Sequence, residues 1–161
     1  MKFWKLMLIM ALALGLFAFV ACDDDDDDDD STAPVVTIED LVVGDWLCSG
    51  DGIPATVAAF EIDSAKVTFV DDQTLTLMQH TPDGGWTTLA GVWTITEEET
   101  GIIHTISIDY TGLVQEGIVE VVEGTPDVMR LEIVALGYGL DVPNPADGFG
   151  DGTNIQIYEK Q

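Results

Sequence analysis

The chain has 161 residues, of which 30 are acidic and 5 are Lys or Arg, so its formal net charge is −25 at pH 7. A surface this negative repels phosphate backbones and excludes nucleic acid as a partner. The chain beyond residue 38 is long enough for one domain with a single modest core.

Residues 1–21 have the organisation of a secretory signal. Lys2 and Lys5 precede an uncharged apolar run that extends from Leu6 to Val20. The run is shorter than the roughly 20 apolar residues that a membrane-spanning helix needs. We therefore expect a signal peptide, and the alternatives are ordinary secretion after cleavage nearby and retention as a membrane helix.

The junction Ala21-Cys22 resembles the lipobox of bacterial lipoproteins. The resemblance implies cleavage before Cys22 and attachment of acyl chains such as palmitate at this residue. It implies a protein bound to a membrane of the bacterial cell envelope, for which we expect the outer membrane, on its periplasmic face or at the cell surface.

Residues 22–38 are predicted to form a disordered tether behind the lipidated cysteine. Eight consecutive aspartates fill positions 23–30, where their charges repel one another and bury no apolar surface. A solvated spacer is one interpretation. The other is a sorting signal, because acidic runs after the cysteine resemble surface-export signals in some bacteria, whereas an aspartate directly after it resembles an inner-membrane retention signal in others.

Residues 39–161 are predicted to form an all-β domain. Short β-branched and aromatic segments recur between Gly, Asp and Pro signals, without a helical period. The connections are short, which favours an antiparallel meander of about eight or nine strands, closed as a barrel or folded as a β-sandwich. The expected strands are 41–49, 56–62, 66–70, 74–80, 87–96, 102–110, 115–122, 127–136 and 154–159.

Alternation along the strands indicates which side chains face the core. Ile106 and Ile108 share one face of segment 102–110, and Met129 and Leu131 share one face of segment 127–136. At the C-terminus, Ile155 and Ile157 give the same alternation. Segment 137–153 is rich in Gly and Pro and is the one long loop.

Three short motifs resemble the lipocalin-like domains of small bacterial lipoproteins. They are the Gly-Asp-Trp at 44–46, the hairpin at 69–74 and the strand at 91–95. The resemblance implies a barrel in which Trp46 closes one end beneath a basic residue, for which Arg130 and Lys160 are the candidates.

An eight-stranded barrel is just wide enough for its own side chains or for one small ligand. If the barrel is open, we expect a small apolar molecule to be the ligand. If it is closed, the same side chains simply fill the core. The candidate lining residues are Trp46, Phe60, Phe69, Trp93, His104, Ile106, Tyr110, Met129 and Leu131.

A calcium site is a candidate in the long loop. Asn144, Asp147 and Asp151 place oxygen ligands within a Gly-rich segment, and calcium takes 6–8 oxygens. The alternative is a turn without metal. Apart from possible calcium in this loop, no cofactor is expected.

No sequence motif for enzymatic catalysis is present, and a non-enzymatic role is expected. Once Cys22 is assigned to lipidation, Cys48 has no partner, and we expect it to be a small buried apolar residue.

The sequence favours a monomeric, lipid-anchored envelope protein that binds a small apolar ligand or serves as an envelope accessory. The alternative is a surface β-sandwich that binds protein or glycan, with calcium in the 144–154 loop. Its contact surface would be an exposed aromatic patch formed by Trp86, Tyr138 and Phe149.

Overall fold

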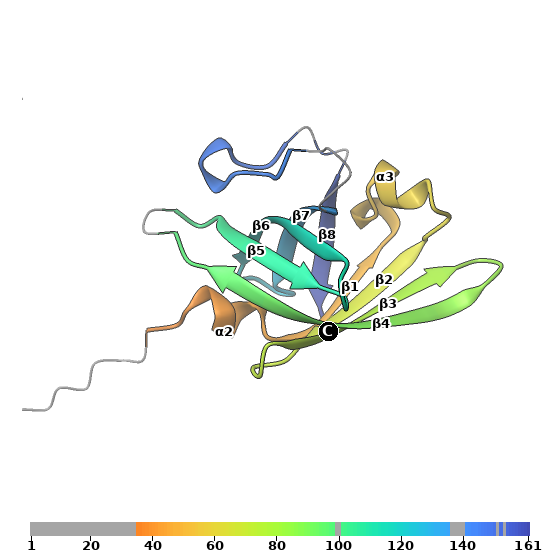
Figure 1. The fold of residues 1–161 in the computed structure, drawn as a ribbon, viewed down its shortest axis with the longest axis horizontal. Helices are drawn as coiled ribbons and strands as arrows, with labels where there is room; N and C mark the ends of the chain where they lie inside the picture. The colour runs from red at the N-terminus through yellow and green to blue at the C-terminus, as the bar shows by residue number, and fades with distance from the viewer. Residues whose placement is uncertain (1–34, 99–100, 136–140, 151, 153) are drawn as a thin grey trace, which may run out of the picture. The chain divides into compact units, whose positions relative to one another are not determined.

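The domain is a closed β-barrel (Figure 1). The computed structural model describes residues 35–98, 101–135, 141–150, 152 and 154–161, within one compact unit, Val35–Gln161. Eight antiparallel strands follow in chain order, which confirms the all-β meander and rules out the β-sandwich. The strands are β1 Gly44–Ser49, β2 Ser64–Phe69, β3 Thr74–Thr81, β4 Gly85–Thr96, β5 His104–Asp109, β6 Val114–Val122, β7 Val128–Ala135 and β8 Ile155–Lys160.

The barrel closes between its first and last strands. Trp46 of β1 pairs with Lys160 of β8, and Leu47 pairs with Glu159, whereas β1 and β2 pair over six positions. Both edges of the sheet are thereby paired, so β1 and β8 leave no long edge open to another chain.

Four short helical segments accompany the strands in the described part of the chain. They are α2 Ile38–Val42, η1 Gly50–Gly52, α3 Ala55–Ala58 and η2 Pro145–Asp147. None of the helices in these described ranges has the length and apolar character needed to cross a membrane.

The strand expected at 56–62 is wrong. The segment begins with the short helix α3, in which the carbonyl of Pro54 accepts hydrogen bonds from the N–H groups of Val57 (3.0 Å) and Ala58 (2.9 Å). Proline suits the start of a helix because it needs no N–H donor there. Glu61 then takes a φ of 61°, a left-handed conformation that does not continue a strand. The β-branched residues here indicated a strand, but local hydrogen bonding makes a helical turn.

The first strand is shorter than expected because α2 precedes it. The Thr37 hydroxyl accepts a hydrogen bond from the Asp40 N–H (3.2 Å), and the Asp40 carboxylate accepts one from the Thr37 N–H (2.9 Å). This capping box satisfies two otherwise unpaired donors at the start of the helix. Ile38 and Val42 of α2 are buried against the barrel core.

One end of the barrel is filled by aromatic side chains, and we call it the closed end. The Trp46 indole N–H donates to the carbonyl of Val42 at 2.7 Å, which joins the barrel to α2. The Trp93 indole N–H donates to two carbonyls around the β2–β3 turn, at 3.2 and 3.1 Å. The Phe69 ring meets Trp93 edge to face, with centroids 5.4 Å apart. Satisfied indole N–H groups let both tryptophans lie deep in an apolar core.

Candidate functional site

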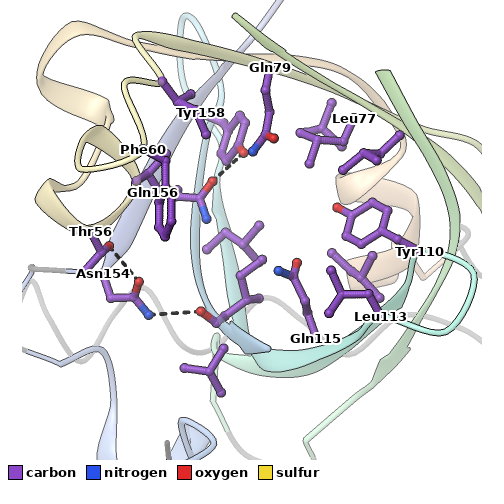
Figure 2. A pocket seen from close by; sticks show the side chains of 18 of the residues that line it. Thr56, Phe60, Leu77, Gln79, Tyr110, Leu113, Gln115, Asn154, Gln156 and Tyr158 are labelled. Carbon is purple, nitrogen blue, oxygen red and sulfur yellow. Dashed lines mark hydrogen bonds between the residues drawn. The ribbon is translucent and has the colours of Figure 1, made fainter. Parts of the chain in front are cut away.

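The other end of the barrel contains a cavity of about 770 Å³ that extends to α3. This volume lies within the range of small-molecule sites, roughly 300–1,000 Å³. Figure 2 shows side chains from several strands directed toward the central opening. The lining residues are Thr56, Val57, Phe60, Ile62, Val67, Phe69, Leu77, Gln79, Leu89, Ile108, Tyr110, Leu113, Gln115, Leu131, Ile133, Val134, Asp141, Asn154, Gln156 and Tyr158.

Side chains alternate between the two faces of each strand, and this alternation directs apolar residues into the cavity wall. Val67, Leu77 and Leu89 are paired across β2, β3 and β4, so their side chains share the inner face of the sheet. On the opposite side, Leu131 and Ile133 come from alternate positions of β7. The wall is therefore continuous around the barrel and mostly hydrocarbon.

Most of the cavity's polar side chains are carboxamides and phenols, and the others are the Thr56 hydroxyl and the Asp141 carboxylate. Gln79, Gln115 and Gln156 come from three different strands, β3, β6 and β8. The Tyr158 hydroxyl donates to the Gln156 side-chain oxygen at 2.7 Å (Figure 2). Tyr110 lies across the opening in the same view. A few polar groups on an apolar wall are typical of sites that fix a ligand's orientation.

Both tyrosines stay protonated at neutral pH. Burial raises the pKa of Tyr110 and that of Tyr158 above the ordinary value of a tyrosine. Tyr110 has room because Gly91 lies beside it, where an added Cβ would come within 3.1 Å of the ring and 2.6 Å of the Asp109 carbonyl. The phenols are thus hydrogen-bonding groups without charge.

Exposed apolar side chains border the mouth of the cavity. Phe60 beside α3, Leu89 of β4 and Leu113 of the β5–β6 turn are 75%, 43% and 41% exposed. Each also lines the cavity, so apolar surface continues from the mouth to the interior.

Hydrogen bonds fix α3 at this mouth. The Thr56 hydroxyl donates to the Asn154 side-chain oxygen at 2.9 Å, and the Asn154 amide donates to the carbonyl of Ile133 at 3.0 Å. The helix is therefore tied to β7 and to the start of β8.

The structure divides the predicted ligand residues into two groups. Phe60, Phe69, Tyr110 and Leu131 line the cavity. Trp46, Trp93, Ile106 and Met129 are buried core residues that do not border it. His104 does not line it either, and its Nδ1 accepts a hydrogen bond from the Glu98 N–H at 3.1 Å.

Lys160 is the basic residue that covers Trp46. Its ammonium nitrogen lies 5.2 Å from the centroid of the indole ring, and the same nitrogen lies 3.4 Å from the Leu41 carbonyl oxygen. Arg130 is directed elsewhere, since it pairs with Glu120 at 3.1 Å and stacks on Phe149 with its guanidinium carbon 4.2 Å from the ring centroid.

The cavity residues of the last strand were not predicted from the sequence. Alternation indicated Ile155 and Ile157 as core residues, and Ile155 is buried, but Ile157 is exposed. The residues of this strand that line the cavity are Gln156 and Tyr158. Residues 154, 156, 158 and 160 share one face of the strand. Because this set is mostly polar, its alternation did not indicate that the face points inward. Polar side chains that line a cavity break the simple rule of apolar inside and polar outside.

The candidate calcium loop is only partly described. Asn144 accepts a hydrogen bond from the Ala146 N–H at 2.9 Å and caps η2, which contains Asp147, while Asp151 lies outside the described residues. Among the described residues, no three acidic, His or Cys side chains gather closely enough to hold a metal.

The two cysteines and the three aromatic residues of the candidate patch are only partly described. Cys48 is buried, as expected, and its thiol donates to the Gly52 carbonyl at 3.0 Å. Cys22 and Tyr138 lie outside the described residues. Trp86 contacts His80 and Lys66, whereas Phe149 contacts Arg130, so these two rings do not pack on the same partners.

No protein-family model, curated protein or solved structure is significantly similar to this chain. The fold and the cavity therefore carry the functional argument by themselves.

Proposed function

We propose that this protein binds a small apolar ligand in its barrel, as a lipocalin-like carrier, and acts by binding rather than catalysis. The cavity of about 770 Å³ carries this proposal. It is lined mainly by hydrocarbon, contains a few polar groups and continues to an apolar mouth. An apolar molecule that leaves water for such a site gains about 25 cal/mol per Å² of apolar surface buried.

The binding site can be tested by filling the cavity. Leu77 is an inward residue of β3 on the cavity wall, so Leu77→Trp should occupy part of the ligand volume. Val92→Trp on β4 is a matched control, because Val92 is exposed and does not line the cavity.

The measurement is native mass spectrometry of the full chain after gentle extraction. We expect a co-purifying lipid-sized mass on the parent protein and on Val92→Trp, and its loss from Leu77→Trp. If the parent carries no such mass and takes up no apolar probe when one is added, the binding proposal is wrong.

We also propose that the protein is a monomer anchored to the bacterial cell envelope, most simply the outer membrane, through acyl chains on Cys22. The support is the resemblance of the Ala21-Cys22 junction to a lipobox. The high negative charge disfavours attachment to anionic lipid surfaces by charge alone, so a covalent anchor is the consistent means of attachment.

Substitution of the cysteine tests the anchor. Cys22→Ser should abolish labelling by a fatty-acid analogue and release the protein from the membrane fraction, whereas Cys48→Ser should leave the labelling unchanged. Membrane retention of Cys22→Ser without labelling would instead indicate an uncleaved helix.

A further inference from the structure

The charges of the side chains that line the cavity indicate whether its ligand is charged or neutral. Among the residues that the structure describes, its lining contains one carboxylate, Asp141, and no Lys, Arg or His. The other polar side chains are neutral hydroxyls and carboxamides. No lining side chain can therefore form an ion pair with an anionic ligand.

The basic residues of the described chain are all engaged elsewhere. Lys66 lies over the Trp86 ring at 5.0 Å, Arg130 pairs with Glu120, and Lys160 lies over Trp46 at the closed end. None of the three borders the cavity. Moving any of them into it would break one of these contacts.

The neutral polar groups supply donors. The Tyr158 hydroxyl donates to the side-chain oxygen of Gln156, and the N–H groups of that carboxamide form no hydrogen bond to the described residues. Gln79 and Gln115 form no side-chain hydrogen bond to any other residue in the ranges that the structure describes. Figure 2 shows both amides directed into the opening.

We infer that the ligand is an uncharged lipophilic molecule that carries a hydrogen-bond acceptor, such as an ester, ketone or alcohol oxygen. This inference rests on the proposed binding function. The carboxamide N–H groups can donate to such an oxygen, and the wall takes up the hydrocarbon. A carboxylate would lose its hydration without gaining an ion pair, and the chain's net charge of −25 would repel it as it approached. An ammonium group would also lose its hydration, and the one lining carboxylate in the described ranges, Asp141, is exposed, where an ion pair contributes little.

A competition experiment with ten-carbon ligands tests the charge. The full chain in zwitterionic nanodiscs is loaded with aminoanthracene, an apolar fluorescent probe, with empty nanodiscs as the blank. Methyl decanoate, decanol, decanoate and decylamine then compete for the probe at pH 7. We expect the two uncharged competitors to displace it at concentrations at least about ten-fold lower than decanoate and decylammonium.

The outcomes separate this inference from the proposed function. If the probe binds but decanoate or decylammonium competes as well as methyl decanoate, the protein is a carrier but its ligand class is not neutral. If neither the probe nor any competitor binds, the carrier function itself is wrong and the inference fails with it.

A charge introduced into the cavity gives a second test. Gln115→Lys places an ammonium group among the lining residues, and Gln115→Met is the control that removes the amide without adding charge. In Gln115→Lys we expect the concentration of decanoate that displaces the probe to fall about ten-fold relative to that of methyl decanoate. In Gln115→Met this ratio should not change. An unchanged ranking in Gln115→Lys would show that missing positive charge is not what excludes the anion.

Discussion

Replacement of Trp46 by Phe separates a structural role from a ligand-binding role. Trp46 is buried at the closed end, where its indole N–H donates to Val42 and its ring lies under the Lys160 ammonium group. Trp46→Phe keeps an aromatic ring but removes the donor, the larger ring and part of the attraction to the cation.

The expected cost follows from these three losses. The Val42 carbonyl becomes a buried acceptor without a partner, which costs about 1–3 kcal/mol. The weaker cation–π contact adds about 0.5–1 kcal/mol, and the smaller ring leaves unfilled volume. Together the free energy of unfolding should fall by about 2–4 kcal/mol, which lowers Tm by about 10 °C in a domain of this size.

Thermal unfolding of the full chain, followed by circular dichroism, measures this loss. Trp86→Phe is the matched control, because Trp86 is partly exposed on β4 and should cost under about 1 kcal/mol. Affinity for an apolar probe should stay within about two-fold in Trp46→Phe, since Trp46 does not line the cavity. Equal stability losses in the two variants would refute this account of the closed end, and a large loss of affinity with little loss of stability would make Trp46 a ligand residue.

Three further comparisons of variants test other parts of the barrel. A Cβ at Gly117 would overlap the backbone of β7, so Gly117→Ala should cost about 1–3 kcal/mol by urea unfolding, whereas Gly150→Ala meets only a side-chain carboxylate at 3.0 Å and should cost less. Glu120 is 5% exposed, so Arg130→Met should cost about 1–3 kcal/mol by leaving its carboxylate unpaired, and adding Glu120→Gln should recover part of that loss. Burial raises the pKa of the Cys48 thiol to about 11, so the unfolded chain loses this proton first and stability should fall as pH rises from about 9 to 11. The urea midpoint should drop less between pH 8 and 10 in Cys48→Ala than in the parent, and equal drops would contradict the assignment.

The general fold could be predicted because strand patterns and short turns are local properties. Ile106 and Ile108 are buried as their alternation predicted, and the hairpin connections define the order of neighbours. Barrel closure was harder to predict, because the pairing of Trp46 with Lys160 joins residues that no local pattern connects.

The cavity could be predicted only in part. Apolar lining residues such as Phe69 and Leu131 were identified because they are inward residues of clear strands. Gln115 and Gln156 were not, because an inward glutamine has the same sequence signal as an exposed one. The helical turn at α3 was also missed, since Thr56 and Val57 favour strands and only Pro54 indicated a helix start.

The seam between β1 and β8 has a consequence for the order of folding. The barrel cannot close until β8 has been synthesised, and before that both β1 and β7 have an unpaired edge. Contacts between strands so distant in sequence form slowly, because the intervening loop entropy is lost before they contribute stability. The barrel of a nascent chain therefore stays open at least until residues 155–160 have been synthesised, so a channel that admits only extended polypeptide would not be blocked by a closed barrel before that point.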